Sequence, residues 1–151
     1  MARIGILTCS NCTQDSNCAS VVCLADMRKR RGFFASYLQD EPLDLIGIIN
    51  CAGCPTLAAP EKILKRVRAV AEFRLDALHL SFCMVTLCPF IKTYAALIKR
   101  EFPDINIVMG THQPVESDRF KRGVKELLCQ SLAAPQTMND FIRGTLKIPP
   151  E

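Results

Sequence analysis

Cysteine is the residue type in this sequence with the most chemistry to offer, because its 151 residues include nine cysteines. Two pairs have the C-x2-C spacing, Cys9–Cys12 and Cys51–Cys54, and Cys83–Cys88 has the C-x4-C spacing. Two residues between thiols let both sulfurs turn toward one metal, and the same spacing suits a disulfide or a redox dithiol. In a reducing compartment, clustered cysteines more often bind metal or do redox chemistry than form structural disulfides.

Short apolar runs predict four β-strands, over residues 3–8, 43–50, 77–82 and 105–110. The intervening segments read as helices over 19–38, from Pro60 and from Pro89; a later helix is capped by Ser117, and a short one over 137–143 stops at Gly144. Such alternation is typical of a parallel sheet between layers of helices. We therefore predict a single α/β domain over residues 1–151, a three-layer sandwich of Rossmann or flavodoxin type with a mainly parallel four-stranded sheet.

This topology predicts where the thiols meet. The carboxyl ends of parallel strands share one edge of a sheet, where open α/β folds build their sites. Each predicted strand is followed there by candidate residues, and the loop after the first strand adds three more thiols. The expected metal ligands are Cys9, Cys12, Cys18, Cys23, Cys51, Cys54, Cys83 and Cys88, with Thr111 and His112 as cofactor-binding residues. Cys129 is expected on the apolar side of the last long helix, and His79 is expected to be packed inside its strand.

Several of these segments resemble the CGGC-domain proteins, small prokaryotic proteins described as metal-binding. The resemblance covers about three quarters of the chain. It runs through IGILTC (4–9), the C-x4-C at 18–23, IGIINCAGCP (46–55), HLSFC (79–83), CP (88–89) and GTH (110–112). It implies that the family's thiols are Cys9, Cys18, Cys23, Cys51, Cys54, Cys83 and Cys88, and that its histidine is His112. Ala52 stands where the family has glycine, and Cys12 and Cys129 are additional to its pattern.

Two functions fit the cysteines. Eight thiols at one edge exceed the four that a single zinc ion needs, which favours an iron–sulfur cluster, 4Fe–4S in the first place, with zinc as the alternative. The protein would then serve in redox or in metal and sulfur handling. The other function is a metal-free thiol–disulfide or persulfide oxidoreductase that uses Cys51 and Cys54. A third interpretation, that the cysteines are small apolar core residues, suits Cys129 best.

Composition limits the partners. The formal charge of +4 is mild and makes nucleic acid an unlikely partner. The basic run Arg28–Arg31 is typical of a solvated helix face, although it could contact an electron-transfer protein. A small sulfur-containing or anionic ligand is the other expected partner. With no apolar run of about 18–20 residues and no signal-peptide core, we expect a cytoplasmic protein that does not enter the membrane.

Overall fold

The core of the fold is a four-stranded parallel sheet. The computed structural model describes residues 1–54, 56–130 and 137–145, with side chains described throughout except at 128–130. The strands are β1 (Ala2–Thr8), β2 (Leu43–Asn50), β3 (Ala77–Leu80) and β4 (Asn106–Val108), in the order β2-β1-β3-β4 with every pair parallel. The predicted parallel sheet is thus confirmed, although β3 and β4 are shorter than predicted. Because β2 and β3 flank β1 on opposite sides, the winding of the chain reverses at β1 and opens a crevice above its carboxyl end.

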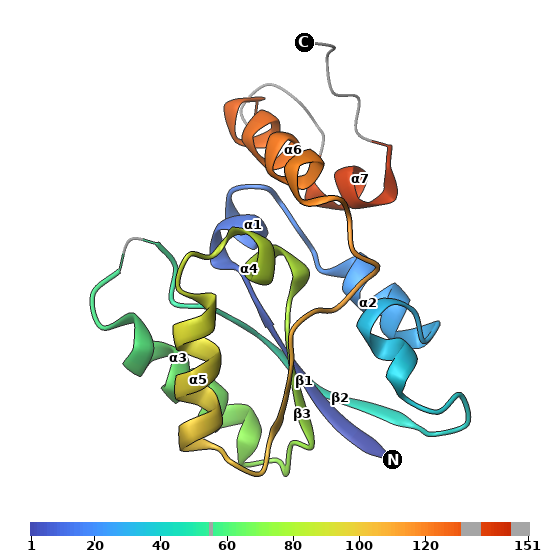
Figure 1. Cartoon of the computed structure of the whole chain (residues 1–151), viewed down its shortest axis with the longest axis vertical. Coiled ribbons are helices and arrows are strands. Elements are labelled where there is room, and N and C mark those ends of the chain that lie inside the picture. The colour runs from blue at the N-terminus through green and yellow to red at the C-terminus, as the bar shows by residue number, and fades with distance from the viewer. Residues whose placement is uncertain (55, 131–136, 146–151) are drawn as a thin grey trace.

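Helices cover both faces of the sheet, as the predicted α/β sandwich requires (Figure 1). On one face, α3 (Ala59–Ala71) and α5 (Ile91–Glu101) pack Val67 and Ile98 against Leu7 and Leu78. On the other face, α2 (Val21–Arg28) and the 3-10 helix η1 (Gly32–Ser36) contact Ile4 and Ile6 of β1. Residues of β1 point alternately to the two faces, as the two-residue period of a strand dictates.

The predicted helix over 19–38 is wrong beyond Arg28, where the chain turns back toward the end of β4. Arg30 and Gly32 both have positive φ, and a side chain at Gly32 would lie 2.5 Å from the carbonyl carbon of His112. The N–H of Phe33 donates to the carbonyl oxygen of Thr111 at 2.9 Å. A long straight helix could not make this contact, so the turn fastens η1 to the segment that follows β4.

Two short helices begin where β1 and β3 end, and neither was predicted. They are α1 (Ser10–Gln14) and α4 (Phe82–Leu87). Helices of five or six residues depend on tertiary packing rather than on an apolar repeat, so they leave little signal in the sequence. As a consequence Cys12 and Cys83 lie on helices, not in loops, and the strand predicted over 77–82 ends at Leu80.

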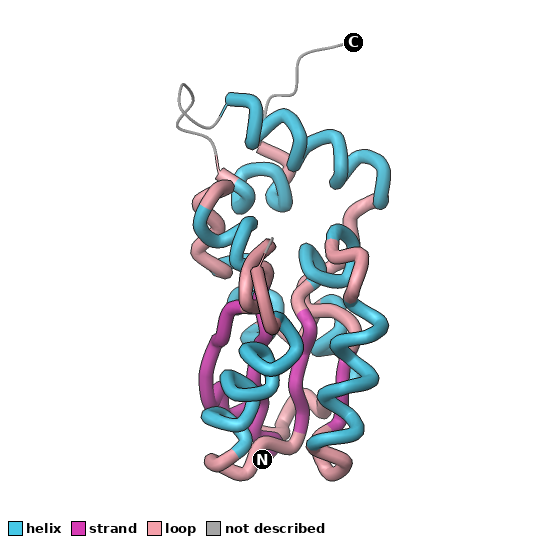
Figure 2. Tube along the Cα trace, turned by 90° about the vertical axis from the view of Figure 1, so that its left-hand side faces the viewer, coloured by secondary structure: helices cyan, strands magenta, loops and turns pink. Residues whose placement is uncertain are grey.

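The last two helices, α6 (Ser117–Gln130) and α7 (Met138–Arg143), lie beyond the carboxyl ends of the strands, above α1 and α4 (Figures 1 and 2). Phe120 and Val124 of α6 and Phe141 of α7 share an apolar cluster with Phe82 and Cys83 of α4. The rim that carries the cysteines is therefore roofed by these helices over part of its length.

The ends of α6 and α7 follow ordinary capping rules, with one correction to the prediction. The carboxylate of Glu116, not Ser117, caps α6, because it accepts the N–H groups of Asp118 and Arg119 at 2.8 and 2.7 Å. Gly144 ends α7 as predicted, with φ of 76°. The prediction for Cys129 concerns a side chain that lies outside the described ones.

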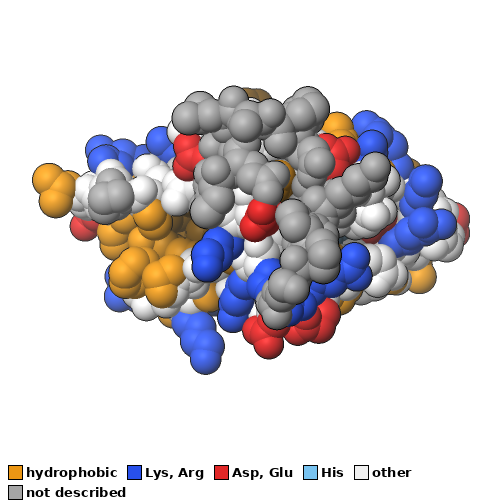
Figure 3. Space-filling model, turned by 90° about the horizontal axis from the view of Figure 1, so that it is seen from above, with side chains coloured by type: hydrophobic (Ala, Val, Ile, Leu, Met, Phe, Trp, Pro, Cys, Tyr) orange, Lys and Arg blue, Asp and Glu red, His pale blue; other side chains and the backbone are white. Residues whose placement is uncertain are grey.

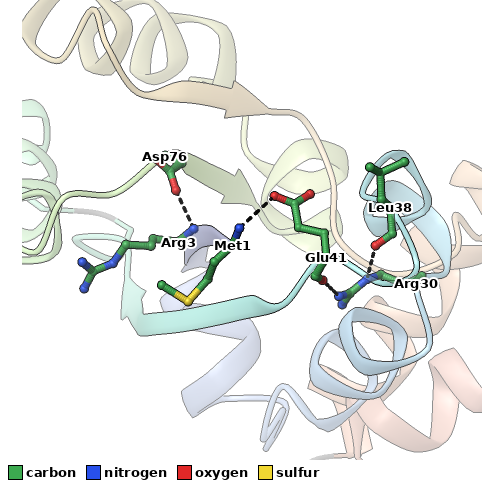
Figure 4. A network of polar contacts seen from close by, with 6 residues as sticks. All are labelled: Met1, Arg3, Arg30, Leu38, Glu41 and Asp76. Atoms are coloured by element: carbon green, nitrogen blue, oxygen red, sulfur yellow. Dashed lines mark hydrogen bonds and ion pairs between the residues drawn. The ribbon is translucent and has the colours of Figure 1, made fainter.

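Polar contacts fasten the opposite, amino-terminal edge of the sheet (Figure 4). The N–H of Arg3 donates to Asp76 at 2.6 Å, and the terminal amine pairs with Glu41 at 3.5 Å. Arg30 donates to the carbonyl oxygens of Leu38 and Glu41. One member of the basic run thus holds the loop before β2 in place. None of the helices in the described ranges combines the length and the hydrophobicity needed to cross a bilayer.

Candidate functional site

Five thiols line one cavity at the carboxyl edge of the sheet. Its volume is about 340 Å³, and its cysteines are Cys9, Cys12, Cys51, Cys54 and Cys88. They come from three separate segments of the chain, which follow β1, follow β2 and end α4. The remaining wall is mostly apolar and includes Met84, Leu87, Phe90 and Val124. Seen from above, exposed hydrophobic side chains gather on the side of the molecule that carries α3 and α5 (Figure 3).

The register of β1 and β2 brings the first two of these segments together. Thr8 pairs with Asn50 at the last position of the two strands, so Cys9 and Cys51 leave the sheet side by side. The N–H of Cys51 donates to the carbonyl of Thr8 at 2.8 Å, and the N–H of Ser10 donates to Cys51 Sγ at 3.3 Å. Cys9 is the N-cap residue of α1 and keeps an extended backbone. Its thiol is half-buried, whereas that of Cys51 is buried.

Four thiols hydrogen-bond one another in a row. Cys9 contacts Cys12 on one side and Cys51 on the other, and Cys12 also contacts Cys83. The Ser81 hydroxyl lies 3.1 Å from Cys83 Sγ and closes the row. This row joins residues more than seventy positions apart, which confirms that the parallel topology brings distant sulfurs to one border.

The row sets the protonation of its members. Hydrogen bonds from Cys12 and then from Cys51 lower the pKa of the Cys9 thiol far below its ordinary value, against the effect of burial. The pKa of Cys12 is raised by its hydrogen bonds with Cys83 and Cys9, and the pKa of Cys51 is raised by its bond with Cys9 and by burial. The pKa of Cys83 is lowered by its bond with Cys12. The lowered pKa thus falls on Cys9, between two thiols whose pKa values are raised.

The backbone adds donors to the same sulfurs. The N–H groups of Cys12 and Asn11 point at Cys9 and lower its pKa further, while those of Ser10 and Gly53 do the same at Cys51. Such N–H···S bonds are the interactions that tune the sulfur ligands of metal clusters.

Three predicted ligands do not line the cavity: Cys83, which joins the row through Cys12, and Cys18 and Cys23. Cys23 is buried on the α2 face among Ile4, Ile6 and Phe34, and its thiol donates to the Thr111 hydroxyl at 3.3 Å. Burial raises the pKa of Cys23 to about 12. The Cys18 thiol donates to Asn139 of α7 at 3.8 Å, and burial raises its pKa too. Cys88 does line the cavity, and its pKa is likewise raised by burial.

Thr111 and His112 support the rim from behind and line neither this cavity nor the polar cleft described below. The Thr111 hydroxyl accepts the N–H of Phe82 at 3.2 Å, in addition to the Cys23 thiol. His112 is buried, donates from Nδ1 to the Gln113 carbonyl at 2.8 Å and stacks at a tilt on Phe82. Burial lowers the pKa of His112. Their predicted contact with a cofactor stays a prediction. His79 is packed as predicted and fully buried.

The donor chemistry of the cavity fits a soft metal, because thiolates are the preferred ligands of iron–sulfur clusters and of structural zinc. Among the described residues, however, no three Cys, His, Asp or Glu side chains are arranged around a common point as a metal ion requires. The sulfurs hydrogen-bond in a row instead. Metal binding would require thiol side chains to rotate toward one centre.

Ser16 is a polar residue of the cavity that was not predicted as part of the site. The Ser16 hydroxyl is buried, lines the cavity and has no hydrogen-bond partner in the part of the chain that the structure describes. An unpaired buried hydroxyl costs about 1–3 kcal/mol, so it marks a place where a ligand could be bound. A lone serine in a loop carries no sequence signal that would have identified it.

A polar cleft of about 630 Å³ adjoins the thiol cavity and shares Asn11 and Cys54 with it. Arg66 and Asp15 are the charged residues among those that line it. Neither was singled out from the sequence, because a charged residue on a helix or in a loop ordinarily reads as a solvated one.

The comparisons with known proteins agree with the resemblance. No curated protein and no solved structure matches the chain. The family model for the CGGC domain matches residues 3–112, which extends from β1 to the histidine after β4 and includes all eight cysteines predicted as ligands. The CGGC domain and the many cysteines together suggest a metal-binding role. The chain belongs to the CGGC domain family.

Proposed function

We propose that this protein holds a metal centre in the thiol cavity. The residues that would bind it are Cys9, Cys12, Cys51, Cys54 and Cys88, with Cys83 adjoining through Cys12. The observation that carries the proposal is the meeting of five thiols from three chain segments around one cavity, beside a serine hydroxyl with no partner among the described residues. A cytoplasmic location, where thiols remain reduced, belongs to the same proposal.

The number of thiols favours an iron–sulfur cluster, of the 4Fe–4S type in the first place, over a single zinc ion. A cluster or more than one metal site would use thiols beyond the four that zinc needs. When bound, a cluster supplies one-electron chemistry, and a zinc ion supplies a structural cross-link. The chain supplies the thiolates, the N–H donors to Cys9 and Cys51, and the Ser16 hydroxyl as a further donor toward a sulfur.

Metal binding requires some thiols of the row to lose their protons. The pKa of Cys9 is lowered, but Cys12 and Cys51 have raised pKa values and must lose protons to become ligands. Metal binding should therefore release protons and strengthen as the pH rises.

The test is purification without oxygen, followed by analysis of metal and acid-labile sulfide. An iron–sulfur protein would be brown, with equal amounts of iron and sulfide, whereas stoichiometric zinc in a colourless protein would favour the alternative metal. Cys54→Ala changes an exposed residue and should lower the bound metal by at least half, while Cys23→Ala removes a thiol outside the cavity and should retain it. Equal metal loss in both variants would contradict the assignment.

A second function, thiol redox chemistry without metal, is favoured by the protonation of the row. The sequence placed the redox dithiol at Cys51 and Cys54, but the lowered pKa belongs to Cys9, whose C-x2-C partner is Cys12. Thiolates rather than thiols attack disulfides. If the purified protein is metal-free, equilibration with thiol–disulfide buffers and mapping of the bond formed should identify Cys9–Cys12 as the reversible pair. A reversible Cys51–Cys54 disulfide would instead identify the pair predicted from the sequence as the redox dithiol.

A further inference from the structure

The polar cleft beside Cys54 has the chemistry of a second binding site. Its walls combine amides, hydroxyls and two charges, in contrast to the apolar thiol cavity next to it, and include Asn11, Gln14, Asp15, Asn50, Thr56 and Arg66. Cys54, which lines both spaces, is the exposed cysteine among those described. A molecule bound in the cleft therefore lies beside the exposed Cys54 thiol.

One wall of the cleft is cationic and fixed in place. Arg66 Nη1 donates to the carbonyl oxygen of Asn50 at 2.8 Å and also to that of Cys51. Within the described residues, its Nη2 and Nε have no partner. A guanidinium held on one side in this way presents its other N–H groups to a carboxylate. Lys62, whose ammonium donates to the Thr56 hydroxyl at 2.7 Å, adds positive charge beside the cleft.

The α1 side of the cleft carries the opposite charge. Asp15 is the residue that ends α1, and its carboxylate has no hydrogen bond or ion pair to another described side chain. Asn50 also lines the cleft, and its Oδ1 accepts hydrogen bonds from the hydroxyls of Thr8 and Thr13 at 2.5 and 3.4 Å. These hydrogen bonds turn its amide N–H2 group, a donor, away from β1.

We propose that the cleft binds a small zwitterionic disulfide of the amino-acid type. Its carboxylate would pair with Arg66, its ammonium group with Asp15, and its sulfur would face Cys54. The Cys54 thiolate bonds to one sulfur of the ligand, the S–S bond of the ligand breaks, and the departing thiolate takes a proton from water. The Cys54 sulfur is oxidised and the departing sulfur is reduced, so the products are a mixed disulfide on Cys54 and one small thiol.

Cys54 is also one of the proposed metal ligands, so metal-free protein is used to test this site. Cystine and the uncharged bis(2-hydroxyethyl) disulfide are compared, and mass spectrometry measures the rate at which each modifies Cys54. Each rate is divided by the rate of the same reagent with a short one-cysteine peptide, which removes intrinsic reactivity. We expect about a tenfold preference for cystine, because each of two partly exposed charge contacts contributes about threefold.

Variants test whether the charges of Arg66 and Asp15 cause the preference for cystine. Arg66→Gln and Asp15→Asn should each lower the preference about threefold, by the same charge-contact estimate. Arg68→Gln removes the same charge from the same helix outside the cleft and should leave the preference unchanged. Equal normalised rates for the two reagents would overturn the proposal. So would an equal fall for both reagents in Arg66→Gln, because Arg66 would then act on the thiol and not on the ligand's charge.

Discussion

At the scale of single residues, the site is defined by the sharing of protons among sulfurs. The pKa of Cys9 is lowered because Cys12 and Cys51 donate hydrogen bonds to its sulfur. The sequence predicted that these cysteines would meet but not which one would ionise, because that depends on side-chain contacts across three segments. Cys12 is also additional to the pattern that the family resemblance supplied, yet it joins Cys9 to Cys83.

The lowered pKa of Cys9 predicts the pH dependence of its alkylation. In metal-free protein, Cys9 should react with iodoacetamide down to lower pH than an unfolded cysteine peptide, because it remains a thiolate there. Cys12→Ala removes the strongest donor and should shift the Cys9 profile upward by about one pH unit, the value of one charge-assisted hydrogen bond.

Cys23→Ala is the matched control for this measurement, since it removes a buried thiol that does not contact Cys9. Mass spectrometry of digested samples reads Cys9 separately from the other thiols. An unchanged Cys9 profile in Cys12→Ala would show that the row does not set its protonation.

At the scale of elements, the strands were predictable and the short helices were not. Buried parallel strands leave apolar runs, and β2 was predicted to the residue. The helices α1 and α4 have no such signature, and Gly32 broke the expected long helix through a contact with the segment after β4. Ser16, Asp15 and Arg66 could not be selected from the sequence because their roles come from the cavities that they line.

The contact between α6 and α7 gives a test of the roof over the rim. A methyl group at Gly123 would lie 2.3 Å from the ring of Phe141, so Gly123→Ala should push α7 away from α6. We expect the free energy of unfolding to fall by about 1–3 kcal/mol, which is typical of overpacking. Hydrogen exchange in α7, relative to that in β1, should be faster than in the unaltered protein.

Lys121→Ala, an exposed change on the same helix, is the control. Equal protection of α7 in Gly123→Ala and in the unaltered protein would contradict the packing described here.

At the scale of the whole molecule, one edge of the sheet is fastened by polar contacts and the other carries the thiols. His79 lies in β3, between these two edges. Its Nδ1 donates to the Gly110 carbonyl, its Nε2 accepts from the Tyr37 hydroxyl, and its ring stacks on Phe34 at 4.3 Å. Burial lowers its pKa to about 4 from the ordinary 6.5.

The sign of the resulting pH dependence follows from that shift. The unfolded chain protonates His79 as the pH falls through 6.5, whereas the folded protein resists until about 4. The contribution of neutral His79 to the free energy of unfolding is therefore fully present above pH 6.5. It is lost as the pH falls toward 4, and the loss is about 3 kcal/mol. Urea unfolding at pH 7 and pH 5 should show a smaller acid loss in His79→Gln than in the unaltered protein, with His112 titrating in both. Equal losses would contradict this role for His79.

The most direct test of the central claim, that five thiols of one cavity act together, is an alkylation footprint of the native protein. Iodoacetamide labelling, read by mass spectrometry, is compared before and after loading with iron and sulfide or with zinc. We expect Cys9, Cys12, Cys51, Cys54 and Cys88 to become protected as a group, while labelling of Cys23 is unaffected. Stoichiometric metal with these five thiols still reactive would contradict that claim.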